Sequence, residues 1–329
     1  MRKSWILFLV LLALLGLGLF LDVNAGYSQI PLRDILEILG GGGVQAQRYT
    51  LLELRLPRVI TSMLVGMALA LSGALLQGIT HNDMADPGIL GLNAGSGLAI
   101  ALVILGAGGL FASYGLMLPA AALTGALATG WITTRLSMVG QRVKPGRLLL
   151  IGVAVSMALN ALSTMVMLRL PDSQYAFVQN WIAGSLWGAD WQNAGLLALG
   201  ILVFGGYAIF CSWTLNVLGL GEEAARGLGV DVQRVYRRFL IAACALSALA
   251  CAAGGGLAFV GLICPHLARR LAGWNHRRML PAACLLGGGL LVYADIISRT
   301  LLLPAEIPVG IVSAVIGAPY FLYLLVKKR

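Results

Sequence analysis

Long apolar runs alternate with short polar segments along the whole chain of 329 residues. A membrane-spanning helix needs about 20 consecutive apolar residues, and most of these runs reach roughly that length. We therefore expect about ten spans, with the polar segments between them as boundaries. The expected spans cover residues 5–21, 58–80, two stretches within 87–134, 148–168, 192–213, 236–253, 259–271, 279–301 and 307–326.

Two of these regions depart from a simple span. Residues 87–134 carry no charge and are too long for one crossing, so Gly106, Gly108 and Gly109 are expected to divide them. Residues 259–271 are short and contain Pro265, which predicts a short, tilted element. Outside the spans we expect a short helix beginning at Pro31 and an interfacial helix in the tryptophan-rich connector 171–191.

Composition agrees with this pattern. The chain is 59% hydrophobic and only 11% charged, whereas soluble domains carry about 25% charged residues. Such a chain cannot cover a water-facing surface, so the expected fold class is an all-α polytopic membrane protein built as one domain, residues 1–329. The first apolar run has no convincing small-x-small cleavage site, which favours an uncleaved first span over a signal peptide.

The net charge of +10 gives the orientation. Basic residues come in short clusters between apolar spans, which favours a membrane partner over nucleic acid. With the N-terminus inside, 17 of the 23 basic residues fall on the inner side, as the positive-inside bias requires. The sequence thus predicts ten spans with both ends in the cytosol, and it places the polar segment 219–238 there as well.

Little in the chain suggests chemistry of its own. The five cysteines all lie in apolar stretches without a C-x-x-C pair, and the three histidines are widely separated. The Walker A sequence that cradles phosphate is absent. We therefore expect neither an enzyme nor a metal site, and no bound cofactor.

The energy for any transport must then come from elsewhere. Ion-coupled transporters usually carry ionisable residues inside the bundle, and the expected spans here hold almost none. Asp295 is the main candidate, but Arg299 lies four residues later and is positioned to pair with it in a purely structural role. The segment 219–238 interrupts the apolar pattern, and we expect Glu222, Glu223 and Arg226 to form a short helix that docks an energy-supplying partner. A solvated loop, and a secondary transporter working alone, stay open as alternatives.

Several motifs in one order resemble the iron-siderophore, haem and cobalamin ABC permease family, over almost the whole chain. Those in the first half are Arg55-Leu-Pro-Arg58, Gly66, Ser72-Gly-Ala-Leu-Leu-Gln77 and Ala85-Asp-Pro-Gly-Ile-Leu-Gly91. Those in the second half are Ala225-Arg-Gly-Leu-Gly229, Phe259-Val-Gly-Leu-Ile-Cys-Pro-His266, His276-Arg277, Ala294-Asp295, Ile307-Pro-Val-Gly310 and Gly317-Ala-Pro319.

The resemblance implies a type II ABC importer in a bacterial cytoplasmic membrane. Two permease subunits, either copies of this chain or this chain and a similar one, would enclose a path. Two cytosolic ATPases would use ATP and magnesium beneath them, and an external binding protein would deliver cargo. The sequence of residues 85–94 resembles that of the ferric-siderophore members, so a ferric siderophore is the expected cargo, with haem and cobalamin as alternatives. The implied ATPase-coupling residues are Leu218, Gly219, Gly221, Glu222, Glu223, Ala225, Arg226, Gly227 and Gly229.

Two further sets of residues follow from the resemblance. Arg55, Arg58 and Arg299 match arginines that receive glutamates of the binding protein, although snorkelling at the membrane interface also explains Arg55 and Arg58. The turn before the fifth span and that span itself would contribute to the gate and the path, and helix packing is the alternative. The expected path residues are Lys144, Pro145, Gly146, Ser156, Met157 and Asn160.

Overall fold

The computed structural model describes residues 2–25, 31–40, 42–106, 116–140, 142–303 and 305–327. The expected break at Gly108 and Gly109 lies outside this range. The first half comprises α1 (Arg2–Asn24), α2 (Leu32–Leu39), α3 (Gln45–Tyr49), the π-helix η1 (Thr50–Arg55), α4 (Leu56–Thr80), the 3-10 helix η2 (Pro87–Leu90), α5 (Leu92–Gly106), α6 (Met117–Leu136), β1 (Met138–Val139), β2 (Arg142–Val143) and α7 (Pro145–Met167).

The second half contains helices and connecting loops, with no strand among its described residues. It comprises α8 (Asp172–Ile182), α9 (Trp191–Gly200), the π-helix η4 (Ile201–Gly205), α10 (Gly206–Phe210), α11 (Ser212–Leu218), α12 (Glu222–Gly227), α13 (Val232–Gly254), α14 (Val260–Ala272), α15 (His276–Thr300) and α16 (Val309–Lys327). The expected short helices in the connector after residue 171 and in the polar segment are α8 and α12, so both predictions are confirmed.

Apolar helices of membrane-spanning length dominate the described residues. Six are long and apolar enough to cross a bilayer, and two shorter apolar helices accompany them. The six are Trp5–Asn24, Gln45–Thr80, Pro145–Met167, Trp191–Phe210, Val232–Gly254 and His276–Thr300, and the shorter pair is Leu92–Gly106 and Val309–Tyr323. The chain is therefore a multi-pass helical membrane protein.

The second span begins earlier than its sequence predicts. Helical structure runs without interruption from Gln45 to Thr80 and passes through Pro57. A proline inside a helix lacks an N–H and clashes with the carbonyl one turn before it. Here the wider π-turns of η1 end at Arg55, directly before this position, and a π-bulge is a recognised way to accommodate such an irregularity.

Two other segments also differ from a simple alternation of spans and loops. The basic loop after α6 contains a small antiparallel hairpin, with Met138 opposite Val143 and Gly140 at a positive φ of 63° in the turn. The expected short element around Pro265 is α14, which has 13 residues and buries the proline. Its length confirms the prediction of a short element at this place.

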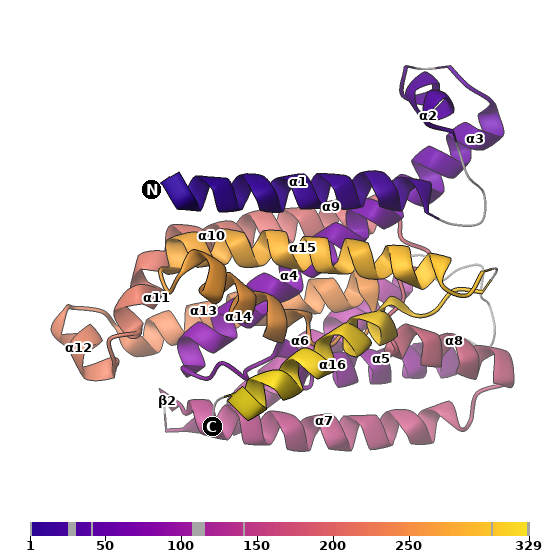
Figure 1. The fold of residues 1–329 in the computed structure, drawn as a ribbon. Helices are drawn as coiled ribbons and strands as arrows, with labels where there is room; N and C mark the ends of the chain where they lie inside the picture. The colour runs from indigo at the N-terminus through magenta and orange to yellow at the C-terminus, as the bar shows by residue number, and fades with distance from the viewer. Residues whose placement is uncertain are drawn as a thin grey trace.

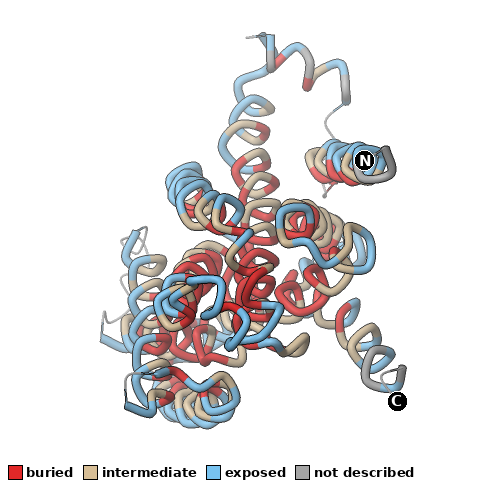
Figure 2. Tube along the Cα trace, turned by 90° about the vertical axis from the view of Figure 1, so that its left-hand side faces the viewer, coloured by how far each residue is buried: buried red, intermediate tan, exposed pale blue. Residues whose placement is uncertain are grey.

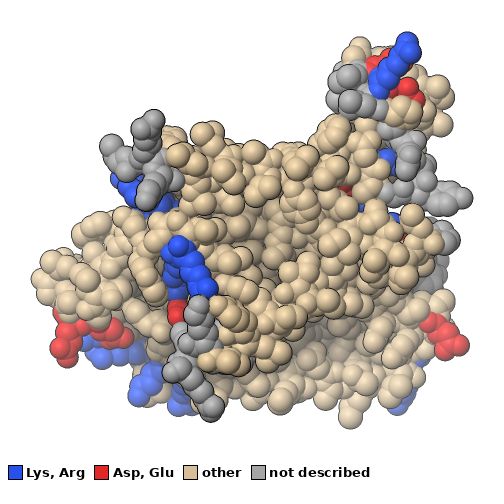
Figure 3. Space-filling view, viewed as in Figure 1, with Lys and Arg blue, Asp and Glu red and all other residues tan. Residues whose placement is uncertain are grey.

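Most helices run along one long axis, and their loops gather at its two ends (Figure 1). One end holds the start of α1, the hairpin, α12 and the end of α16. The opposite end holds α2 and α8. In the space-filling view, charged side chains gather toward these two ends and leave a broad uncharged band between them (Figure 3), as a bilayer-embedded surface requires.

Helix α4 lies at the centre of the bundle. In the segment Gln45–Thr80, 78% of the apolar window is buried, against 11% for α7. Buried positions gather in the middle of the bundle, and the first helix shows exposed positions on its outer side (Figure 2). A Cβ added at Gly66 would overlap the carbonyl of Gly287 in α15, so glycine allows these two backbones to touch.

Candidate functional site

The segment between α11 and α13 forms a small exposed lobe at one end of the molecule. Gly221 begins it and Gly229 ends it, with positive φ values of 100° and 81° that favour glycine. Within α12, the Arg226 guanidinium donates to the Glu222 carboxylate at 2.8 Å, one helical turn apart. The acid in the first turn and the base in the last turn both complement the helix dipole.

One side of this lobe is anchored and the other is free. Ala225 is fully buried, and its carbonyl accepts a hydrogen bond from the Val230 amide at 3.0 Å. Leu218 is buried too, and its carbonyl lies 3.0 Å from Nε2 of His81. Glu222, Glu223, Gly227 and the flanking residues Gly219, Gly221 and Gly229 are exposed. The lobe is therefore a fixed projection with an open polar face.

Two exposed leucines add to this face. Leu220 is 67% exposed and Leu228 is 58% exposed, on either side of α12. Neither is among the coupling residues expected from the sequence, although Leu228 lies within the motif Ala225-Arg-Gly-Leu-Gly229. In the sequence, each is an apolar residue next to glycine inside a polar segment. A large apolar side chain that is exposed on a polar lobe is typical of a contact surface.

The expected docking arginines lie at the opposite end, and Arg58 and Arg299 belong to an ion network there. The Arg58 side chain is 13% exposed and binds two carboxylates. Its Nη2 lies 2.9 Å from Oδ1 of Asp295 in α15, and its Nη1 lies 2.9 Å from Oε2 of Glu306 in the segment before α16. Arg58 thereby links α4 to α15 and to the segment that precedes α16.

Arg299 extends this network toward α1. Its Nη2 pairs with Asp22 and also lies 3.1 Å from Oδ2 of Asp295, so the expected pairing four residues apart is confirmed. Nη1 of Arg299 donates to the Ala25 carbonyl at 3.2 Å. Arg55 is buried as well and donates to the Val23 carbonyl at 2.9 Å. Burial of a charge is costly unless the charge is paired. Arg58 and Arg299 are each paired with carboxylates, which meets that requirement.

The three arginines are therefore enclosed within the subunit and do not extend freely from its outer end. Local reasoning gave only the pair Asp295 and Arg299 and missed both carboxylates of Arg58: Arg58 and Asp295 are 237 positions apart, and Arg58 and Glu306 are 248 apart. The only sequence signal for these ion pairs is that few acidic residues lie next to the spans. The assignment of Arg55, Arg58 and Arg299 to docking stays a prediction.

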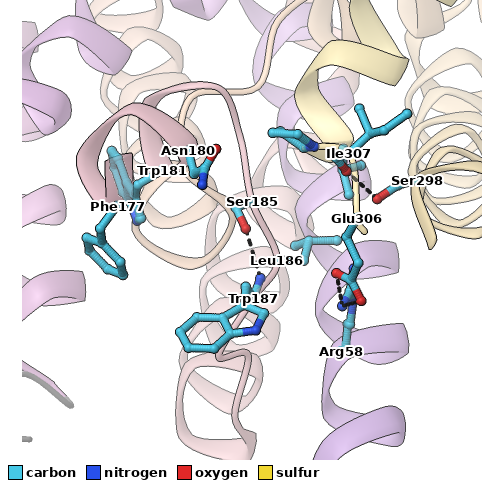
Figure 4. Close-up of a pocket in the computed structure, with 12 residues that line it drawn as sticks. Arg58, Phe177, Asn180, Trp181, Ser185, Leu186, Trp187, Ser298, Glu306 and Ile307 are labelled. Atoms are coloured by element: carbon cyan, nitrogen blue, oxygen red, sulfur yellow. Dashed lines mark hydrogen bonds and ion pairs between the residues drawn. The ribbon is translucent and has the colours of Figure 1, made fainter. Parts of the chain in front are cut away.

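A cavity of about 320 Å³ opens beside Arg58. Its walls come from the end of α8 and the loop that follows, and from the segment between α15 and α16 (Figure 4). Asn180, Trp181 and Trp187 lie on one side, and Glu306 and Arg58 lie on the other. The cavity combines aromatic surface with hydrogen-bonding groups and a charge pair, a typical composition for a recognition pocket.

The expected path residues all lie on α7 or directly before it. Lys144 occupies the N-cap and Pro145 the first helical position, where its missing N–H is harmless. Gly146 is exposed, and a Cβ added there would meet no atom within 4 Å. Their role at a gate stays a prediction.

Deeper in α7 the three candidates differ. The Ser156 hydroxyl donates to the Gly152 carbonyl at 2.8 Å and lies next to Gly91, which fits packing. Met157 and Asn160 are exposed on the outside of this single chain. Only a surface between subunits or lipid can cover them, and their part in a path is untested.

A second polar cluster joins α14 to the end of α4 and the loop after it. Arg269 of α14 pairs with Asp83 and with the Gln77 side chain, and its guanidinium lies 5.5 Å from the centre of the Trp274 ring.

The five cysteines are unpaired, and the described residues contain no cluster of three potential metal ligands.

Comparison with known proteins agrees with this architecture. The chain is 38% identical to the iron(3+)-hydroxamate import system permease protein FhuG of Bacillus subtilis, over 100% of the chain and 98% of the relative. It is 38% identical to the Fe(3+) dicitrate transport system permease protein FecD of Escherichia coli, over the full length of both.

A solved structure is similar over nearly its whole length. It is described as a metal-chelate type ABC transporter in an inward-facing conformation, and it superposes with a TM-score of 0.84 at 30% identity, covering 98% of this chain and 99% of that one. The FecCD transport family model matches residues 11–327. The chain therefore belongs to the FecCD transport family, as its motifs led us to expect.

Proposed function

We propose that this chain is the membrane-spanning permease subunit of a type II ABC importer and performs no bond chemistry itself. The observation that carries the proposal is the α12 lobe, an exposed helix held by a buried Ala225 between two membrane helices. Membership of the FecCD family and the lack of a Walker A sequence support it. The energy then comes from separate ATPase subunits that use ATP and magnesium.

The proposed topology has ten crossings with both ends in the cytosol. The start of α1, the hairpin, α12 and the end of α16 share one end of the molecule, and most basic residues of the connecting segments lie there (Figure 1). This agrees with the positive-inside bias. The membrane is the bacterial cytoplasmic membrane, in keeping with the organisms of the relatives.

Three kinds of partner follow from this arrangement. Two ATPases bind the α12 lobes, and an external binding protein docks at the outer end near the arginine network. A second permease subunit covers α7, whose side chains Leu150, Met157 and Met165 are strongly exposed. The path for cargo then lies between the two permeases, and α7 contributes Ser156, Met157 and Asn160 to it.

The proposed cargo is a ferric siderophore. Two relatives that match along the whole chain are permeases for iron(3+)-hydroxamate import and Fe(3+) dicitrate transport, which supports a chelated iron complex as the cargo. ATP binding closes the ATPases, the α12 lobes move with them, and the helices switch access from outside to inside. Such a switch requires the partners to interact differently with the two states.

Reconstitution tests the proposal directly. The permease is placed in liposomes with its ATPase and binding protein, and uptake is measured across ferric siderophores, haem and cobalamin. We expect ATP-dependent uptake of a ferric siderophore and ATPase stimulation by the loaded binding protein. Uptake driven by an ion gradient without ATP would instead identify a secondary transporter.

A matched pair of variants tests the lobe in the same assay. Alanine at Glu222, Glu223 and Arg226 removes the charged face of α12, so ATPase association and uptake should fall while the permease stays folded. Alanine at the exposed Arg237 and Arg238 removes charge nearby at the start of α13 and should preserve association. Wild-type uptake by the first variant would exclude α12 as the coupling element.

A further inference from the structure

A cavity of about 490 Å³ opens between α6 and α13. It is larger than the cavity of about 320 Å³ beside Arg58, and its size is typical of a small-molecule site. The last turn of α6, the first turns of α13 and the hairpin contribute to its walls. None of its lining residues belongs to the proposed coupling, docking or path residues, so the proposed transport does not account for it.

Two arginines from different helices line this cavity at the end where the hairpin lies. Arg135 is in the last turn of α6 and Arg237 is near the start of α13, and both are exposed. Among the described residues neither has an ion-pair partner, whereas the exposed Arg226 and Arg234 each pair with an acid. Two uncompensated guanidinium groups beside one space favour an anion, and arginine binds phosphate through parallel N–H donors.

The other half of the cavity is apolar. Leu127 precedes Arg135 by eight positions in α6, and Ala245 follows Arg237 by eight in α13. At 1.5 Å per helical residue, both apolar residues lie about 12 Å deeper in the membrane than the charges. Leu127 is 41% exposed and Ile241 beside it in the lining is 57% exposed. A small water-soluble anion would leave this half unfilled, whereas an acyl chain matches it.

Trp131 indicates the depth of the charged half. Its side chain lines the cavity and is 62% exposed, and the Arg135 guanidinium lies 5.5 Å from the centre of its ring. Tryptophan is enriched at the membrane–water interface, where its ring lies at the level of the lipid head groups. Arg135 follows one turn later and is therefore at the level of the lipid phosphates.

We propose that this cavity binds one anionic phospholipid, with its phosphate between Arg135 and Arg237 and the upper part of an acyl chain along Leu127, Ile241 and Ala245. Basic pockets between membrane helices suit such head groups. A zwitterionic lipid binds less well, because its ammonium group is repelled by two arginines. The site requires only that the chain crosses a membrane. It lies between α6 and α13 and not in the α12 lobe, so ATPase association does not depend on it.

The test measures lipid binding to the full chain purified in detergent. Phosphatidylglycerol and phosphatidylcholine with the same acyl chains are titrated separately, and the retained lipid is counted by native mass spectrometry. Wild type should bind one phosphatidylglycerol about tenfold to thirtyfold more tightly, because each arginine beside an anionic head group contributes about fivefold. Arg135→Gln alone should lose about fivefold of this preference, and Arg135→Gln combined with Arg237→Gln should abolish it.

The matched control removes the same charge from neighbouring positions. Arg142 of the hairpin and Arg234 of α13 are exposed and do not line the cavity. Arg142→Gln combined with Arg234→Gln should therefore keep the preference for phosphatidylglycerol. The melting temperature of each variant without added lipid shows whether it is folded. Glycerol phosphate has the head group but no acyl chain, and it should not displace the lipid at equal concentration.

Three results would overturn the proposal. Equal binding of the two lipids, or an equal loss of preference in the two double variants, would show that the cavity does not select an anionic lipid. Displacement by glycerol phosphate would identify a site for a free anion. Retention of phosphatidylglycerol by the single chain but not by the chain assembled with its partner subunits would assign the cavity to a protein contact.

Discussion

Asp295 is the residue on which the outer network depends, because it accepts from both Arg58 and Arg299 while fully buried. Asp295→Asn keeps the shape but leaves two guanidinium groups short of one negative charge. Loss of one partner of a buried pair costs about 3 to 5 kcal/mol. We expect the melting temperature in detergent to fall by about 5 °C or more, measured by intrinsic fluorescence.

The same substitution at a solvated ion pair is the control. Asp231 pairs with Arg234 at 3.1 Å, and both side chains are more than half exposed. Surface pairs of this kind contribute little, although Asp231 also caps α13 through the Arg234 amide. Asp231→Asn keeps an oxygen for that cap and should leave the melting temperature nearly unchanged. Equal losses at the two positions would contradict a special role for Asp295.

At the scale of residues, the sequence predicts contacts within an element and misses those between elements. The pair Asp295 and Arg299 follows from helical spacing alone. The partners Asp22 and Glu306 do not, since only folding brings α1 and the segment before α16 to α15. The family motif singled out the three arginines, but it carried no information on their burial.

The close contact between α4 and α15 gives a prediction for a whole element. A Cβ at Gly287 would overlap the Gly66 carbonyl and lie 2.5 Å from the Ala70 Cβ, so the helices would have to separate. Gly287→Ala should therefore destabilise the bundle, by about 1 to 3 kcal/mol as for other overpacked cores. Thermal unfolding of the purified permease measures it.

Gly289 offers a control two residues further along the same helix. An added Cβ there meets no atom within 4 Å, and alanine is favoured over glycine in a helix by about 1 kcal/mol. Gly289→Ala should leave stability unchanged or raise it. A loss at Gly289 as large as that at Gly287 would show that an effect shared by both positions, such as lipid contact, and not backbone contact with α4, explains the result.

Apolar periodicity locates elements well and their irregular parts poorly. The first span and the fifth appear as α1 and α7, with ends shifted by a few residues. The hairpin at residues 138–143 and the π-turns before Pro57 were not expected. Both depend on a few hydrogen bonds within short polar stretches, and hydrophobicity does not register these.

At the scale of the molecule, charge predicts which ends of the helices face the same side. Figure 1 places α12 with the start of α1 and the end of α16, at the end opposite α8. The positive-inside bias had grouped the same segments. The surface of α7 could not be predicted, because a helix that is apolar all round looks the same in sequence whether lipid or a second subunit covers it.

Orientation in the membrane yields the last prediction. In a variant whose five cysteines are replaced by alanine, one new cysteine is placed at Leu228, in the lobe, or at Trp187, in the loop after α8. Both side chains are more than half exposed, and the helices next to them, α12 and α8, lie at opposite ends of the molecule (Figure 1). A membrane-impermeant maleimide added to intact cells with an opened outer barrier should label Trp187→Cys strongly and Leu228→Cys only after the membrane is disrupted. Because the melting temperature of each purified variant is measured alongside, a misfolded protein is recognised by its lowered value. Labelling of Leu228→Cys from outside in a folded protein would reverse the orientation, and with it the assignment of the α12 lobe to an ATPase.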